Sequence, residues 1–262
     1  MNQTLLFDVE AHGLSEVEKI SSRIRSTHTV GGTLAEYGYS ISGASGHVHL
    51  LYRFDQEDDL VPKLLPHCRW VPLVFGFYCC KPESGDLLTA YRVASESEIQ
   101  LLSPKGQWSE EVELYSGYPP SFPLQRVRIK KLKHDPDDLH CALKYSAVFG
   151  LAHLSTDDYQ NALELVRPRH AELYRQGETD LGLEQFLSEN SEPFMQGCPD
   201  NSCIWEDCKF YGKNYMKTFA SIEGHPTAQM QLWSDTDDDP MNQLVFRQCL
   251  GCRTIYVTSQ GY

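Results

Sequence analysis

The sequence predicts an α+β fold, with a mainly antiparallel sheet in the first half, a helical segment in the middle and a small cysteine-rich β subdomain at the C-terminus. Three observations predict it. Segments rich in aromatic and β-branched residues fill residues 30–132, separated by Gly, Asp and Pro clusters. The hydrophobic period becomes helical over residues 135–190. Five of the nine cysteines follow, from Cys198 to Cys252.

These patterns suggest two units. Residues 1–190 form an α+β domain, and residues 191–262 form a subdomain packed on it, with the hinge at 188–193. The chain has 262 residues with 41% hydrophobic content, which is enough for a substantial core. We expect the first unit to stay folded when the tail loses the metal ion that its cysteines are predicted to bind.

The first unit opens with an expected helix, because Ser15 and Glu18 form a capping box and Val17, Ile20 and Ile24 recur at helical spacing. The strands predicted after it span residues 37–41, 47–54, 70–80, 87–93, 98–102 and 124–132. No helix-length segments separate them, so an antiparallel sheet is expected.

Three helices are predicted in the middle of the chain. The first begins at Asp135, the second at Ser155 and the third at Thr179. Pro168 is expected to kink or end the second, because proline cannot donate the backbone hydrogen bond that a helix interior needs.

The tail alternates as strands over residues 216–222, 228–233, 243–248 and 254–257, with one cysteine pair before the first strand and another between the last two. Two such pairs joined by a small antiparallel sheet form a zinc-ribbon-like arrangement. Four thiolates hold Zn²⁺ tetrahedrally, and they leave no open position for water. The sequence therefore predicts a structural zinc site in the tail.

Cys249 and Cys252 form one pair of predicted ligands, with two intervening residues. The other pair is Cys198 with Cys203, or Cys203 with Cys208, since both have four intervening residues. The preferred set is Cys198, Cys203, Cys249 and Cys252, because Pro199 favours a turn after the first ligand; Cys208 is the alternative ligand.

The other cysteines lie in apolar segments and are expected to be core thiols: Cys68, Cys79, Cys80 and Cys141. His47 and His49 share one face of a predicted strand. No third ligand is evident nearby, so an exposed polar row is expected there instead of a metal site.

The formal net charge is −13, which opposes a polyanionic partner. The one basic cluster comprises Arg126, Arg128, Lys130, Lys131 and Lys133. Its first three members alternate with Val127 and Ile129, as on the wet face of a half-buried strand that bulges or ends near Lys130. Nucleic acid is therefore not expected as a partner.

The N-terminus has no basic start and reaches Asp8 and Glu10 early, unlike a signal peptide. No apolar run approaches the roughly 20 residues of a membrane helix. We expect a cytoplasmic protein with no membrane partner, in which nine cysteines serve as metal ligands and core thiols and not as disulfides.

Three stretches of the tail, at 216–222, 231–235 and 244–256, resemble the C-terminal part of the YwqG-like family of uncharacterised bacterial proteins. The resemblance covers mainly residues 198–258. The chain departs from the usual zinc-ribbon pattern at Arg253, because a ribbon usually has glycine after the second cysteine of a pair. The resemblance implies an α+β fold and supplies no catalytic residues.

Common catalytic motifs are absent, including G-x-S-x-G, the phosphate-binding glycine loops and H-E-x-x-H. His170 and Glu172 form an H-x-E motif, but the cysteine spacing after it does not fit a zinc deaminase. We expect these two residues to lie on the solvent-exposed face of a helix instead. The first hypothesis is therefore a non-enzymatic, zinc-stabilised protein that binds another, basic protein, in regulation or toxin neutralisation (immunity-type). The second is an enzyme with three zinc ligands plus water and His225 as acid or base.

Overall fold

The computed structural model describes residues 4–8, 13–20, 26–43, 48–76, 78–79, 88–102, 113–114, 119–131, 156–191, 203, 205–213, 216–223 and 243–260. In chain order the elements are β1 (Thr4–Asp8), β2 (Gly13–Lys19), β3 (Thr29–Gly32), the 3-10 helix η1 (Ala35–Tyr37), β4 (Ser40–Gly43), β5 (His49–Asp55), β6 (Trp70–Phe75), β7 (Tyr78–Cys79), β8 (Leu88–Ser95), β9 (Glu98–Leu102), β10 (Glu113–Leu114), β11 (Phe122–Lys131), α2 (Thr156–Gln176), α3 (Leu183–Ser191), β12 (Met216–Glu223), β13 (Gln243–Cys249) and β14 (Ile255–Gln260). Strands dominate, so the fold is α+β in the broad sense that the sequence predicts.

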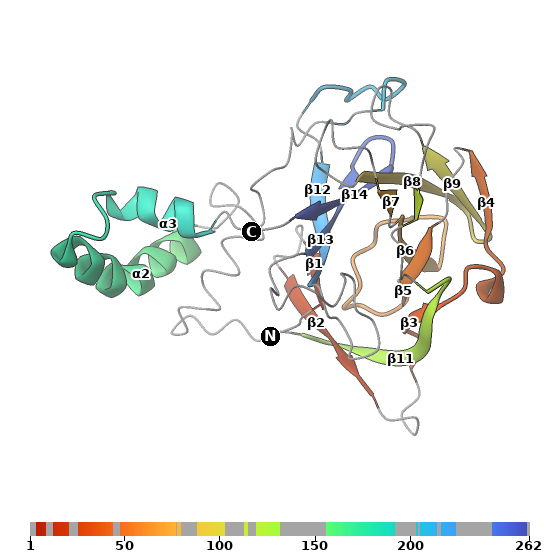
Figure 1. Cartoon of the computed structure of the whole chain (residues 1–262), viewed down its shortest axis with the longest axis horizontal. Coiled ribbons are helices and arrows are strands. Elements are labelled where there is room, and N and C mark those ends of the chain that lie inside the picture. Colours follow the sequence, from red (N-terminus) through yellow and green to blue (C-terminus); the bar gives the residue numbers. More distant parts are fainter. Residues whose placement is uncertain are drawn as a thin grey trace.

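Twelve strands form one curled sheet in the order β4-β9-β8-β14-β13-β12-β1-β2-β11-β3-β5-β6 (Figure 1). The pairing of β4 with β9 is parallel. The other pairings in this order are antiparallel, as expected. The short strands β7 and β10 pair separately.

The position of the tail strands corrects the predicted domain organisation. β12, β13 and β14 lie inside the main sheet, where β14 pairs with β8 and β12 pairs with β1. A subdomain merely packed on an N-terminal domain would leave β8 and β1 unpaired on these edges. The sheet is therefore built jointly by the two ends of the sequence.

The edge strand β6 is covered by side chains of β8. The Tyr91 hydroxyl donates to the Pro72 carbonyl at 2.9 Å and accepts from the Val74 N–H at 3.4 Å. Thr89 Oγ1 accepts from the Gly76 N–H at 3.0 Å. An unpaired strand edge exposes backbone groups to other chains. Here two side chains at alternate positions of β8 satisfy those groups and close the curled sheet.

The main hydrophobic core lies within this curl and includes Tyr52, Tyr91 and Phe246, each at most 1% exposed. The loop between β5 and β6 is organised by buried Gln56. Its side-chain oxygen accepts from the N–H groups of Leu64 and Leu65, at 2.7 and 2.9 Å. Gln248 of β13 donates to the Leu64 carbonyl at 3.2 Å, which ties this loop to the tail.

β11 confirms the predicted half-buried strand. Val127 and Ile129 are buried at 1% and 8% exposure, while Arg126, Arg128 and Lys130 are exposed. The strand ends at Lys131, close to the predicted end. Arg128 and Lys130 form ion pairs with Glu18 of β2, at 2.6 and 2.9 Å.

The predicted first helix is wrong, because Gly13–Lys19 forms strand β2. β2 pairs with β1 on one edge and β11 on the other, so its backbone groups are satisfied by neighbouring strands. The apolar spacing of this segment suits a helix, but the two available strand partners outweigh so weak a local preference.

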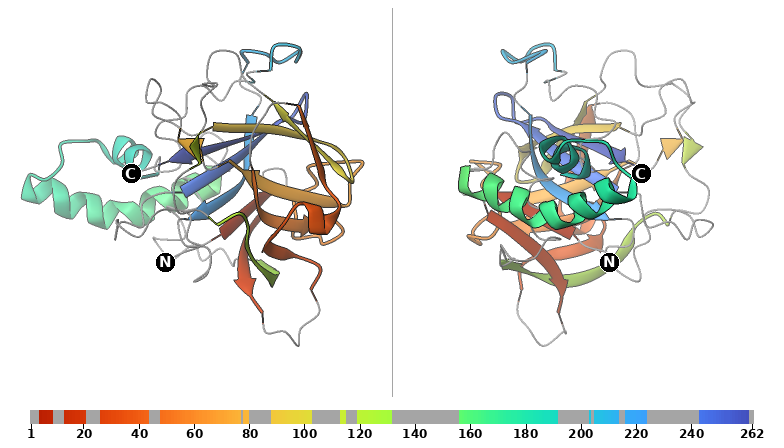
Figure 2. Two further views of the ribbon diagram at one scale, coloured as in Figure 1. Left: turned by 45° about the vertical axis from the view of Figure 1, so that its right-hand side comes forward. Right: turned by 90° about the vertical axis from the view of Figure 1, so that its left-hand side faces the viewer.

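The helices α2 and α3 form a pair at one side of the sheet (Figure 2). Leu163 and Val166 of α2 pack against Phe186 and Leu187 of α3 in a small core of their own. The second and third predicted helices are thus confirmed, although α2 continues through Pro168. The helix predicted from Asp135 lies outside the described residues. No helix among the described residues is long and apolar enough to span a membrane.

Candidate metal centre

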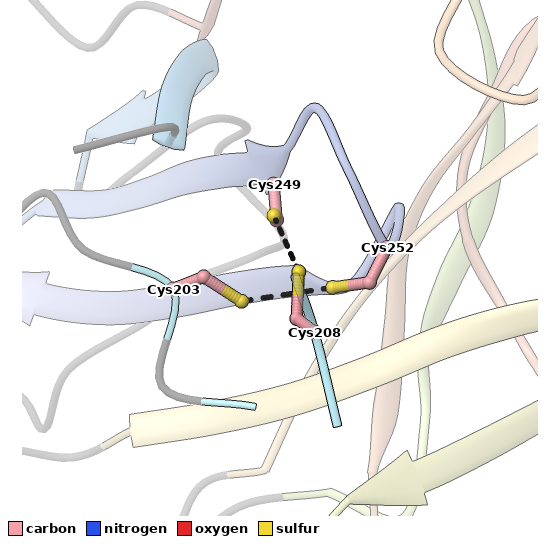
Figure 3. Close-up of side chains that lie close together, drawn as sticks. All are labelled: Cys203, Cys208, Cys249 and Cys252. Carbon is pink, nitrogen blue, oxygen red and sulfur yellow. Dashed lines mark hydrogen bonds between the residues drawn. The ribbon is translucent and has the colours of Figure 1, made fainter. Parts of the chain in front are cut away.

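Four cysteines converge where the end of β13 meets a turn-rich segment that precedes β12 (Figure 3). Cys249 is the last residue of β13, and Cys252 lies in the turn that leads to β14. Cys203 and Cys208 come from the preceding segment, and their thiols point toward the other two. We call the segments at 203–213 and 249–254 the first and second knuckle.

The spacing of the four sulfur atoms fits a tetrahedral metal ion. All four ligand atoms lie within 4.8 Å of one another. The Sγ atoms of Cys203 and Cys252 are 3.6 Å apart, and those of Cys208 and Cys249 are 3.7 Å apart. Ligands about 2.3 Å from a tetrahedral zinc ion would be separated by about 3.8 Å. Cys203, Cys208 and Cys249 are buried and Cys252 is half-buried, so the group could bind a metal ion shielded from solvent.

The first knuckle is held by backbone hydrogen bonds. The Cys203 carbonyl accepts from Gly212 N–H at 2.9 Å, and the Trp205 carbonyl accepts from Cys208 N–H at 2.9 Å. The Cys208 Sγ also accepts from the Phe210 N–H at 3.4 Å. Gly212 has φ 66°, a left-handed conformation that glycine adopts without steric cost.

The second knuckle closes in the same manner but with a different residue at its left-handed position. Arg253 N–H donates to the Cys249 carbonyl and Cys249 N–H donates to the Thr254 carbonyl, both at 2.9 Å. Arg253 has φ 59°, so this turn forms although it lacks the usual glycine. Gly251 lies against the Phe210 ring, and a Cβ there would overlap the ring. The two knuckles therefore pack directly on one another.

The pKa values of the thiols differ within the cluster. Burial raises the pKa of Cys203 and also that of Cys249. Burial opposes ionisation of Cys252 too, but hydrogen bonds from Thr254 and Arg92 outweigh it and bring the pKa of Cys252 down to about 7. A metal ion would favour the deprotonated thiolates, so its binding would release protons from Cys203 and Cys249.

The structure brings together the predicted ligands Cys203, Cys249 and Cys252 with Cys208, the alternative ligand. The preferred fourth ligand, Cys198, lies outside the described residues. Cysteine spacing alone does not distinguish the two, because both intervals have equal length. Gly212 is the sequence feature that could have favoured Cys208 as the fourth ligand. A glycine four residues after Cys208 permits the left-handed turn that closes the first knuckle.

Comparisons of the chain with protein families, curated proteins and solved structures found no match. The YwqG-like resemblance therefore stays a prediction.

Other sites proposed from the sequence lie apart from the cysteines or outside the described residues. His49 is buried and its Nε2–H donates to the Pro119 carbonyl at 2.7 Å, so it is not the exposed polar residue that was expected. His170 is half-buried between α2 and α3 and donates to the Leu181 carbonyl at 2.7 Å. Glu172 pairs with Arg169. His47 and His225 are outside the described residues.

The expected core thiols are described in part. Cys68 is half-buried against the main core. Cys79 lies in β7, and nothing is described of its side chain; Cys80 and Cys141 are outside the described residues.

One further pair has the composition of a catalytic dyad but the wrong geometry. Buried His28 lies 3.0 Å from Asp58 through Nε2, while its Nδ1 accepts from the Asp55 backbone N–H at 3.1 Å. A general base needs a ring nitrogen that can reach the proton it removes. Both nitrogens of His28 are engaged with the protein, so this pair fixes the start of the β5–β6 loop.

Proposed function

We propose that this chain holds Zn²⁺ in a closed structural site and acts by binding another protein, with no chemistry at the metal. The observation that carries the proposal is the group of four thiols within 4.8 Å of one another. A tetrahedral ion bound by four thiolates has no position left for water or substrate. Tetrahedral sulfur coordination suits zinc, and it also suits iron, so the metal must be identified by measurement.

Metal analysis tests the first part. Protein purified without chelators and with its thiols kept reduced should carry one zinc per chain, and X-ray absorption should show four sulfur ligands. Cys249→Ser is the matched variant, and it should lose the metal. Well under half an equivalent of zinc in the wild-type protein would reject the proposal.

The same measurement separates this proposal from the enzyme hypothesis. A catalytic zinc site would show three protein ligands and one oxygen or nitrogen, with His225 then a candidate acid or base. The four thiols supply a complete ligand set without Cys198 or a histidine, and this favours the structural site. Because the ligands must be reduced thiols, we propose a cytoplasmic location, where thiols are kept reduced.

The partner that we propose is a basic protein. The net charge of −13 supports this, because complementary charge steers association and selects partners. Regulation and toxin neutralisation are settings that such a protein would suit. A partner captured on the immobilised chain should be identified, purified and titrated by calorimetry, with its affinity falling as salt is raised. An affinity independent of salt would contradict the electrostatic basis of recognition.

Nucleic acid is the contrasting partner class. The described part of the basic cluster is the wet face of β11, where Arg128 and Lys130 already pair with Glu18. We therefore expect no measurable shift of duplex DNA or RNA at micromolar protein and moderate salt. A shift that weakens with salt, as counterion release requires, would contradict this.

A further inference from the structure

Arg92 of β8 contacts both knuckles of the cysteine cluster although it is not a ligand. Its Nε donates to Thr254 Oγ1 in the second knuckle at 2.8 Å. Its guanidinium carbon lies 4.6 Å from the centre of the Trp205 ring in the first knuckle. Guanidinium groups stack on aromatic faces and donate hydrogen bonds in the same plane, so one side chain can join the two segments.

Thr254 lies between Arg92 and the sulfur atom of Cys252 and contacts both. Thr254 Oγ1 lies 3.1 Å from Cys252 Sγ, and Thr254 is fully buried. A hydroxyl oxygen that accepts from Arg92 keeps its own hydrogen for donation. Once a metal holds Cys252 as a thiolate, the chain of contacts runs from the Arg92 Nε–H through the Thr254 hydroxyl to the sulfur. Groups in such a chain polarise one another and favour the charged acceptor.

Charge gives a second reason for Arg92 at this place. A divalent ion with four thiolates carries a net charge of −2, and three of these thiols are buried. Burying net charge is costly unless an opposite charge offsets it. Arg92 brings a permanent positive charge to the ligand Cys252, from a strand that belongs to the first half of the chain.

We propose that Arg92 is a positioning residue of the metal centre, which holds the two knuckles together and offsets the charge of the thiolate cluster through Thr254. This inference rests on the proposed zinc site. It makes β8 part of the metal centre, beyond the four cysteines. Partners around metal ligands typically change metal affinity 10–100-fold when they are replaced.

The test measures zinc affinity by competition with a chromophoric chelator, using the full chain. Arg92→Met keeps most of the length and removes the charge and donors, and it should weaken zinc binding 10–100-fold. Arg92→Lys keeps the charge without the planar donor group, and its zinc affinity should lie between those of Arg92→Met and the wild type. Arg126→Met is the control, because Arg126 is an exposed arginine on β11, outside both knuckles. It should bind zinc as the wild type does.

A second readout separates this role from a general loss of stability. In cobalt-substituted protein, the sulfur-to-cobalt charge-transfer band should shift in Arg92→Met and in Thr254→Val, and stay unchanged in Arg126→Met. Thr254→Val also serves if Arg92→Met does not fold. Equal zinc affinities in Arg92→Met or Thr254→Val and the wild type would overturn the role of Arg92. A weakening in Arg126→Met equal to that in Arg92→Met would overturn it too. A wild-type chain that binds no zinc would instead reject the metal site itself.

Discussion

Arg253 holds a left-handed backbone conformation, φ 59°, directly after the last cysteine of the cluster. In that conformation Cβ crowds the following carbonyl, which costs roughly 1–2 kcal/mol for residues other than glycine. The hydrogen bond from Arg253 N–H to the Cys249 carbonyl requires this turn, so the second knuckle accepts the cost. The YwqG-like resemblance departed at this residue, and the structure shows that the departure does not prevent the turn.

Replacing Arg253 by glycine should therefore leave the metal-loaded protein as stable as before or stabilise it by up to about 1 kcal/mol, after the higher entropy of the unfolded glycine chain is subtracted. Urea unfolding of the zinc-loaded protein measures this. Arg253→Val should destabilise it, because a β-branched residue suits positive φ least. Arg126→Gly on β11 is the control, and it should destabilise by about 0.5–1 kcal/mol, since glycine weakens a strand. Clear destabilisation by Arg253→Gly would show that the side chain matters more than the backbone.

Gly251 is constrained by its neighbour in the first knuckle. A Cβ at this position would overlap the Phe210 ring, so Gly251→Ala must push the ring away and separate the knuckles. We expect a loss of about 1–3 kcal/mol in unfolding free energy, together with weaker zinc retention against a chelator. Gly182→Ala is the matched control, because a Cβ at residue 182 would meet no neighbouring atom within 4 Å. Unchanged zinc retention in Gly251→Ala would mean that the knuckles need not touch.

At the residue scale, the structure brings together cysteines that the sequence singled out by their spacing. Cys249 and Cys252, which lie in that cluster, were predicted as ligands because two intervening residues suit a metal-binding turn. The choice between Cys198 and Cys208 depended on Pro199, which is a turn signal without information about what the turn faces. Arg92 could not be predicted, because its role depends on β8 pairing with β14, a contact between distant parts of the sequence.

At the scale of elements, the covered edge of β6 is the feature that closes the sheet. Pro72 fits this strand because proline is tolerated where no neighbouring strand needs its N–H. The Pro72 carbonyl and the Val74 N–H are instead satisfied by Tyr91, which is fully buried. The sequence predicted both strands, but not that a tyrosine of one would serve as the hydrogen-bonding partner of the other.

Tyr91→Phe should lower the unfolding free energy by about 1–3 kcal/mol, because it leaves buried backbone groups without their partner while keeping the ring. Urea unfolding measures the loss, and hydrogen exchange should locate it at the Val74 amide. Tyr174→Phe is the control, since Tyr174 is 60% exposed and the change should have little effect. An unchanged Val74 exchange rate in Tyr91→Phe would show that the edge is protected by other means.

A strand could be predicted where its own residues alternate clearly between apolar and polar. It could not be predicted where its formation depends on pairing with distant strands. β11 was predictable because its apolar and basic residues alternate over several positions. β2 was mistaken for a helix, and β1 was not predicted, because their strand form depends on each other and on partners far along the chain: β1 pairs with β12, and β2 pairs with β11.

At the scale of the whole molecule, the order of strands determines which parts of the sheet should lose stability when the metal is removed. The sequence suggested that the tail alone depends on zinc. The tail strands instead lie between β8 and β1, so their disorder would remove a pairing partner from each. Zinc binding is worth about 10–16 kcal/mol in isolated fingers, comparable to the roughly 5–15 kcal/mol that stabilises a whole domain. The effect of metal loss should therefore spread through the sheet.

The helical pair provides an internal reference for this effect, because α2 and α3 pack on each other through their own small core. In Cys249→Ser, hydrogen exchange should rise in β12–β14 and also in β8 and β1, while α2 and α3 keep most of their protection. Cys68→Ser is the matched control, since it changes a half-buried thiol outside the cluster, and it should leave zinc content and the protection of β14 unchanged. If exchange rises only in the knuckles and β12–β14, with β8 and β1 still protected, the tail is an independent unit after all. The strand order makes that outcome unexpected, because β8 and β1 would then have to hold their hydrogen-bonded amides without the neighbours that bond them.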